Sequence, residues 1–167
     1  MSISEVRVSR RTRFAIVGLG LIANKAFVYG WNFGVYPAVL VLGGPIYGSL
    51  LMFPLNFGAN YGTLRLYDWS GKDWLGIETI KEVREYHGPR LIGRVLSRAL
   101  NAPLGVAVVV LSLVFDPFIT TAYLRHGAHL YDGLSRRDWR IFLASFMVGT
   151  SYWVALVLLG IKAIELL

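Results

Sequence analysis

Apolar residues in this chain gather into four long runs that are separated by polar segments. The runs cover residues 14–33, 38–59, 104–124 and 141–160. Each has the length of about 20 residues that a helix needs to cross the hydrocarbon core of a bilayer. Their continuous apolar character differs from the one-sided stripe of a helix on a soluble protein. The pattern predicts an all-α, polytopic integral membrane protein with about four transmembrane helices in a single domain, residues 1–167.

The connections between the runs differ in length and in character. A tight connection is expected at Gly34–Pro37, whereas a polar stretch, residues 60–103, separates the second run from the third. Within that stretch, arginines recur every four residues and so share one face of a helix, while apolar residues share the other face. This pattern predicts an amphipathic helix at the cytoplasmic interface. Arg90, Arg94 and Arg98 would contact lipid headgroups. The alternative is a solvated helix that packs beneath the bundle.

The distribution of basic residues predicts the orientation in the membrane. Basic residues are concentrated in the tail, residues 1–13, and in the stretch 60–103. These regions share a side if all four runs cross, and the positive-inside rule then places both termini in the cytoplasm. An uncleaved cytoplasmic tail and a bacterial inner-membrane location follow from this arrangement.

Four further arginines conflict with the positive-inside rule in that arrangement. They lie between the third and fourth runs and are Arg125, Arg136, Arg137 and Arg140. In the four-span topology they fall on the external side. An alternative is that the run 104–124 is re-entrant and turns back at Asp116–Pro117. The four arginines then become cytoplasmic, and the C-terminus lies outside.

Composition agrees with a membrane protein and narrows the possible chemistry. Of the 167 residues, 55% are hydrophobic and 16% are charged, against about 25% charged in soluble domains. The net charge of +7 is explained by cytoplasmic arginines and by contact with anionic lipids, so nucleic-acid binding is not expected. The absence of cysteine excludes disulfides and thiol chemistry.

Two charged residues lie inside apolar runs and are the main candidates for function. Lys25 falls in the first run and Asp116 in the third. A charge near a bilayer centre costs about 3 kcal/mol or more, so it usually has a partner or a function. We predict that Lys25 and Asp116 form a polar centre lined by Asn24, Thr120 and Thr121. The alternatives are a purely structural ion pair, or a Lys25 side chain that reaches the interface.

Small residues in the second run suggest close helix packing. Gly44 and Gly48 form a GxxxG pair, which allows helix backbones to approach closely. The adjacent Gly43-Gly44-Pro45 sequence alternatively predicts a broken helix that lines a substrate cavity.

The C-terminal third carries motifs of one membrane protein family. They are the segment Gly133–Leu143, the Gly149-Thr150-Ser151-Tyr152-Trp153 sequence, Gly160, and the segment Val114–Phe118 before them. This region resembles the end of the DedA/VTT (SNARE-associated) family, although the arginines that flank the family's proline are absent here. The resemblance implies translocation of a lipid carrier or phospholipid, driven by an ion gradient, and it favours the re-entrant topology.

We therefore expect a small transporter or flippase-like protein that moves an ion, a polar solute or a lipid headgroup. The alternative is a non-transporting scaffold or accessory subunit of a membrane complex. A homo-oligomer or a larger membrane complex is expected, because one chain of 18.7 kDa forms a thin wall for a conduit. No catalytic set and no cofactor are expected. No metal site is expected either, since the two histidines with possible ligand spacing, His126 and His129, fall in a predicted loop.

Overall fold

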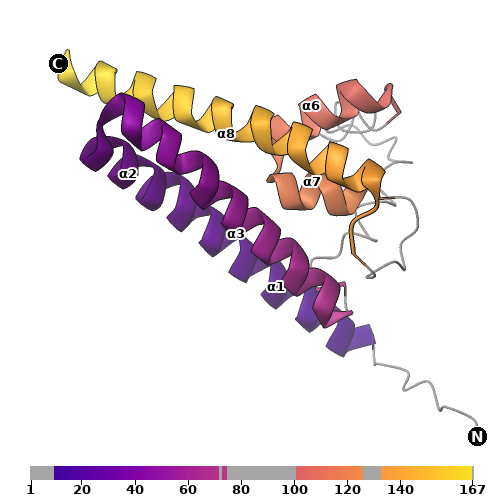
Figure 1. Cartoon of the computed structure of the whole chain (residues 1–167). Coiled ribbons are helices and arrows are strands. Elements are labelled where there is room, and N and C mark those ends of the chain that lie inside the picture. Colours follow the sequence, from indigo (N-terminus) through magenta and orange to yellow (C-terminus); the bar gives the residue numbers. More distant parts are fainter. Residues whose placement is uncertain (1–9, 72, 75–100, 126–132, 167) are drawn as a thin grey trace, which may run out of the picture.

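The protein is all-α in the part that the structure describes, residues 10–71, 73–74, 101–125 and 133–166 (Figure 1). This computed structural model contains no strand within those ranges. Its helices are α1 (Arg10–Gly30), α2 (Tyr36–Gly43), α3 (Ser49–Ser70), α6 (Leu104–Val114), α7 (Pro117–Leu124) and α8 (Arg136–Glu165), with π-helical turns η1 (Trp31–Val35) and η2 (Gly44–Gly48). The predicted all-α class is confirmed for these residues.

The first half of the chain forms a long helical hairpin. α1, η1 and α2 follow one another as one arm, and α3 returns beside it as the second arm (Figure 1). The reversal occurs at Gly44, whose φ of 69° lies in the region that favours glycine. Gly48 then packs closely on the first arm, because a Cβ atom there would lie 2.7 Å from the carbonyl oxygen of Val39.

The prediction of a tight connection at Gly34–Pro37 is wrong. The chain continues as a helix there, because Pro37 is accommodated inside the first arm. Pro37 lies in the first turn of α2, where its missing N–H is least costly. The preceding turn η1 is wider than an α-helix, and the N–H of Tyr36 donates to the carbonyl oxygen of Trp31. Such a π-helical turn absorbs a local misfit without ending the helix.

The second arm is also longer than predicted. α3 continues past residue 59 to Ser70, so the first part of the expected polar stretch is helical. It ends at Gly71, which has a φ of 57° and donates its N–H to the carbonyl oxygen of Asp68 at 3.2 Å. This left-handed glycine is a common helix terminator.

The predicted third run is two short helices rather than one continuous helix. Phe115 and Asp116 between α6 and α7 are extended, with ψ of 160° and 154°. The residue before a proline disfavours the α conformation, so Pro117 forces the break at Asp116. α6 and α7 fold back on each other beside the first half of α8 (Figure 1). The chain therefore turns at the position that the re-entrant alternative predicted.

Helix α8 is the support on which α2, α3, α6 and α7 pack. It contains the predicted fourth run, and a capping box begins it, in which the N–H of Asp138 donates to Ser135 Oγ at 3.2 Å and the N–H of Ser135 donates to the Asp138 carboxylate at 3.0 Å. Gly149 lies against the α6–α7 break, where a Cβ atom would be 3.7 Å from Pro117.

Aromatic pairs hold α8 antiparallel to α3. Their ring centroids are 5.5 Å apart for Tyr61 and Trp139, 5.6 Å for Phe57 and Phe142, and 5.9 Å for Phe53 and Phe146. The buried core continues from these pairs to α6 and α7 and contains Leu64, Tyr67, Leu111, Phe118, Ala122, Tyr123 and Phe142.

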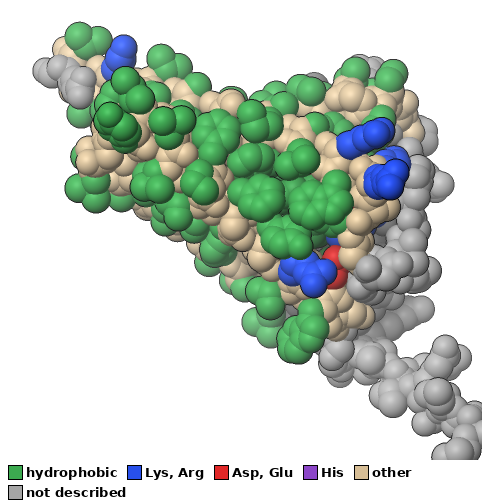
Figure 2. Space-filling model, viewed as in Figure 1, with side chains coloured by type: hydrophobic (Ala, Val, Ile, Leu, Met, Phe, Trp, Pro, Cys, Tyr) green, Lys and Arg blue, Asp and Glu red, His purple; other side chains and the backbone are tan. Residues whose placement is uncertain are grey.

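The surface is apolar along most of its length, and charge is found at the ends. Figure 2 shows lysine or arginine side chains near the start of α8, one at the opposite end, and hydrophobic side chains between them. Leu42 and Tyr47 at the hairpin tip are 88% and 78% exposed. Two described helical stretches, Gly18–Ser70 and Arg136–Ile164, are long and apolar enough to cross a membrane by length and composition, and 18-residue windows within them have mean hydropathies of 1.8 and 1.9.

Candidate functional site

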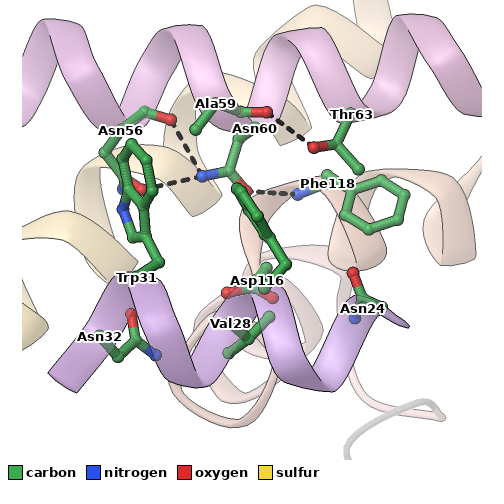
Figure 3. A pocket seen from close by; sticks show the side chains of 11 residues that line it. Asn24, Val28, Trp31, Asn32, Asn56, Ala59, Asn60, Thr63, Asp116 and Phe118 are labelled. Carbon is green, nitrogen blue, oxygen red and sulfur yellow. Dashed lines mark hydrogen bonds between the residues drawn. The ribbon is translucent and has the colours of Figure 1, made fainter. Parts of the chain in front are cut away.

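A narrow polar cleft lies between the two arms of the hairpin (Figure 3). One wall is formed by a single face of the first arm, which carries Asn24, Phe27, Val28, Trp31 and Asn32. These residues recur at intervals of three or four, so they lie above one another on the helix. The cleft has about the size of a single water molecule.

The opposite wall is formed by α3 and by the start of α7. Asn56, Asn60 and Thr63 project from α3, and Asp116 and Phe118 come from the α6–α7 break. Figure 3 shows Asp116 between the two arms. The break therefore brings a carboxylate from the third apolar run into the space between the first and second runs.

Buried amides connect the cleft wall to the helices behind it. Asn56 Nδ2 donates to Thr150 Oγ1 of α8 at 2.6 Å, and Asn60 Nδ2 donates to Asn56 Oδ1 at 2.9 Å. The N–H of Phe118 in turn donates to Asn60 Oδ1 at 3.3 Å. Each such bond contributes about 1 kcal/mol. Together they fix α3 against both α7 and α8.

Asp116 differs from these amides because its carboxylate has no partner among the described residues. It makes no side-chain cap to α7 and no described ion pair. It is also the one charged side chain among the described residues that line the cleft. An unneutralised carboxylate in such a place attracts a proton or another cation.

A second cleft residue also has an unsatisfied polar atom. The Nε1 atom of Trp31 is buried and has no hydrogen-bond partner within the described part of the chain. Buried polar atoms are usually paired, so an unpaired one calls for an explanation such as a bound molecule. Trp31 Nε1 is a donor, and the carboxylate of Asp116 is an acceptor.

The structure brings together some of the predicted site residues and separates others. Asn24 and Asp116 both line the cleft. Lys25 is exposed, does not line the cleft and forms no described ion pair with Asp116. Successive residues on a helix point about 100° apart, so Asn24 and Lys25 face different directions. Thr120 and Thr121 are fully buried behind the cleft rather than in its lining.

The two glycines predicted to pack helices have different roles. Gly48 does pack against the first arm of its own hairpin, whereas a Cβ atom on Gly44 would meet nothing within 4 Å. Gly44 serves the turn instead, through its positive φ. Arg90, Arg94 and Arg98, predicted to bind headgroups, lie outside the described residues, as do His126 and His129.

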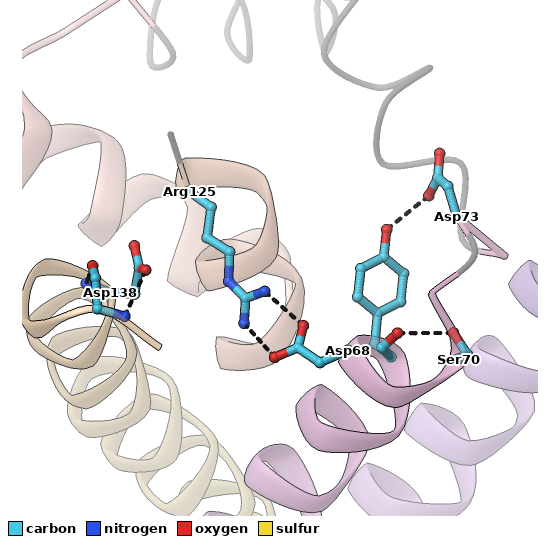
Figure 4. Close-up of polar contacts among 7 residues, drawn as sticks. Asp68, Ser70, Asp73, Arg125 and Asp138 are labelled. Carbon is cyan, nitrogen blue, oxygen red and sulfur yellow. Dashed lines mark hydrogen bonds and ion pairs between the residues drawn. The ribbon is translucent and has the colours of Figure 1, made fainter. Parts of the chain in front are cut away.

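A buried ion pair, which the sequence did not reveal, lies below the cleft at the arginine-rich end. Arg125 donates to both carboxylate oxygens of Asp68, at 2.6 and 3.0 Å (Figure 4). The two side chains are 7% and 5% exposed. Asp68 lies in the last turn of α3 and Arg125 follows α7, so the pair joins two helices that the polar cleft also joins. From the sequence, Asp68 was placed in the polar stretch 60–103 and Arg125 directly after the third run, and the two were not paired.

No group of three or more His, Cys, Asp or Glu side chains that could hold a metal occurs among the described residues. The chain matches no family model, no curated protein and no solved structure. Function therefore has to follow from the cleft and its surroundings.

Proposed function

We propose that this chain is a small integral membrane protein that moves a cation through the polar cleft, with Asp116 as the charge that the cation meets. The observation that carries this proposal is the unpartnered carboxylate of Asp116 in a cleft that is otherwise lined by uncharged described residues. Charged residues within apolar bundles commonly mark ion pathways.

The outward faces of the helices support a membrane location. Large hydrophobic side chains are exposed along the hairpin, as Leu42, Tyr47 and Leu19 illustrate with 88%, 78% and 69% exposure. Soluble monomers rarely expose continuous apolar surfaces of this kind. Residues 26–64 contain no charged residue. At 1.5 Å per residue the two arms of this stretch are about 27 and 31 Å long, which matches a hydrocarbon core of about 30 Å.

The fold supports the re-entrant topology over the four-span one. The hairpin crosses twice, α6 and α7 enter and return, and α8 crosses once. The start of α1 and the end of α8 then lie on opposite sides, as they lie at opposite ends in Figure 1. Arg125 and the arginines that start α8 share the end where α3 finishes, so the positive-inside rule makes that end cytoplasmic. Lys162 is the basic residue left on the other side.

In the same arrangement, the charge of Lys25 lies where its transfer into the membrane costs little free energy. Because the hairpin turns at Gly44 rather than at Gly34–Pro37, Lys25 precedes the uncharged stretch instead of interrupting it. An exposed lysine there can extend its ammonium group to the headgroups. This favours the alternative in which Lys25 reaches the interface.

The chemistry of the cleft favours a cation over a phosphate headgroup. A phosphate needs arginine, lysine or free backbone donors, and no basic side chain lines the cleft among the described residues. The closed, water-sized cleft is one state of a transporter, which has to widen before a larger solute can enter.

A non-transporting membrane subunit is the second candidate. It is favoured by α1, where none of the described side chains from Gly18 to Gly30 is buried. Such a surface suits a partner helix as well as lipid. The GxxxG pair cannot supply such a surface, because Gly48 packs inside the hairpin.

The experiment that tests the proposal is cation flux into proteoliposomes that contain the full chain. Protons are followed with an entrapped pH dye, and sodium and potassium with tracer uptake. We expect Asp116→Asn to abolish the flux, whereas Asp73→Asn, which neutralises an acid outside the cleft lining, leaves it intact. Equal flux with and without the Asp116 carboxylate, or no flux above that of empty liposomes, would support the accessory-subunit candidate instead.

A further inference from the structure

We infer that the cation is a lipophilic organic cation, such as a quaternary ammonium or phosphonium ion, held by Asp116 against the aromatic side chains of Phe27 and Trp31. This inference rests on the proposed function and names the ligand class of the same cleft. Its basis is the combination of one carboxylate with two stacked aromatic side chains in a single lining.

The aromatic residues give the cleft two properties that an organic cation uses. Phe27 of α1 and Trp31 of η1 stack on the first arm, with ring centroids 5.6 Å apart and an interplanar angle of 28°. Aromatic rings attract a cation electrostatically and also bury its apolar substituents, and the attraction is largest for tryptophan and in desolvated sites. A carboxylate supplies the remaining charge.

The oxygen atoms of the cleft are arranged poorly for an alkali or alkaline-earth ion. A bare metal ion of this type is surrounded by about six oxygen ligands. Here Asn56 Oδ1 and Asn60 Oδ1 each accept a hydrogen bond within the protein. Thr63 donates its hydroxyl hydrogen to the carbonyl oxygen of Ala59 at 2.8 Å, and its oxygen lone pairs stay available. Even with that oxygen, Asp116, Asn24 and Asn32 supply fewer than the full set, so a metal ion here would have to keep part of its water shell.

The cleft has to widen for such a ligand, and α1 is the wall with the least buried described side chains, although it packs closely on Trp74 at Gly20. From Gly18 to Gly30 no described side chain is buried, whereas Asn32, Tyr36 and Leu40, just beyond, are 7%, 1% and 2% exposed. The π-helical turn η1 lies at this boundary. A π-helical turn in a helix is a common location for a functional irregularity. Bending there moves Phe27 and Asn24 away from Asp116 while α2 stays packed.

The test is binding of tetraphenylphosphonium to the purified full chain in detergent, measured by equilibrium dialysis. Tetraphenylborate, which has the same shape and the opposite charge, controls for partition into the micelle. We expect saturable binding of the cation alone. Asp116→Asn is expected to abolish it, whereas Asp116→Glu, which keeps the charge, retains binding.

The aromatic contribution is tested with matched tryptophan variants. Trp31→Leu is expected to weaken binding by about fivefold to thirtyfold, and Trp31→Phe by less, because a ring remains. Trp69→Leu removes an indole that is 86% exposed and lies outside the lining, so it is expected to leave binding unchanged. Size-exclusion profiles identify any variant that fails to fold. If Trp31→Leu fails to fold, the more conservative Trp31→Phe is compared with the wild type instead.

The outcomes separate this inference from the proposed function. If tetraphenylphosphonium does not bind but Asp116-dependent proton or alkali-ion flux persists, the ligand class is wrong and the proposed function stands. If Trp31→Leu binds as tightly as Trp69→Leu, the aromatic wall has no part in recognition and the inference is overturned. If neither binding nor flux depends on Asp116, the proposed function fails as well.

Discussion

Helices α1 and α8 are both long and apolar, yet they relate to the rest of the protein in opposite ways. α8 buries Ile141, Phe142 and Ser145 against its neighbours, whereas α1 buries none of its described side chains. The difference arises from what faces each helix. α8 meets aromatic rings of α3 in register, and α1 meets a polar cleft. Length and hydropathy therefore indicate that a helix suits a membrane, but its packing depends on the facing helix.

The two helices are expected to differ most in the free energy of unfolding that is lost when a phenylalanine side chain is truncated to alanine. Phe142→Ala removes a fully buried ring and is expected to lower the free energy of unfolding by about 3–5 kcal/mol. Phe27→Ala, on α1, removes a ring that is 48% exposed and is expected to cost under about 1 kcal/mol. Reversible unfolding in mixed micelles measures both. Similar losses would show that α1 is packed as tightly as α8.

The ion pair that joins α3 to the end of α7 gives the next effect. Asp68→Ala leaves the buried Arg125 guanidinium without its carboxylate, and we expect a loss of about 3 kcal/mol in the same measurement. A double variant, Asp68→Leu with Arg125→Met, removes both charges and is expected to recover much of that loss. A double variant as unstable as the single one would contradict this account of the pair.

A smaller effect is expected where α8 holds α3 through one hydrogen bond. Thr150→Val keeps the side-chain shape but removes the acceptor of the 2.6 Å bond from Asn56. The buried amide is then unpaired, at a cost of about 1–2 kcal/mol. Ser151→Ala, at an exposed position on the same helix, is the matched control and is expected to be neutral. A neutral Thr150→Val would mean that Asn56 finds another partner.

The smallest expected effect concerns motion rather than stability, and it is measured as the spread of distances between spin labels on two helices. The chain has no cysteine, so spin labels can be placed in pairs at the exposed positions Ala23, Leu66 and Ala144. We expect a broader distance distribution between α1 and α3 (Ala23→Cys with Leu66→Cys) than between α3 and α8 (Leu66→Cys with Ala144→Cys). Pulsed electron resonance measures both. Equal widths would argue against movement of α1.

Local sequence signals predicted several features well. The helical class followed from the apolar runs, and the break at Asp116–Pro117 followed from the proline, whose effect on the preceding residue is local. The start of α8 is also encoded by neighbours, through the capping box of Ser135 and Asp138, but the predicted fourth run began only at residue 141 and missed it. Each of these features depends on residues within one turn of each other.

Other features depended on contacts between distant residues and were not predictable in this way. Gly34–Pro37 and Gly43–Pro45 are similar turn signals, and the choice between them rests on how η1 accommodates Pro37 and how Gly48 packs on α2. The pairing of Asp68 with Arg125 joins residues 57 positions apart. Asp116 was identified as a site residue from its cost in an apolar run, but Lys25 was paired with it only because their depths matched.

The glycine turn of the hairpin has a consequence for the membrane insertion that the proposed function requires. Because no charge lies between Lys25 and Arg65, the hairpin tip would cross the bilayer without carrying an ionised side chain, each of which costs about 2.5–3.5 kcal/mol at the helix centre on insertion scales. Both arms can thus partition together as a preformed helical pair during biosynthesis. Membrane integration of the first half would then need no translocated hydrophilic loop.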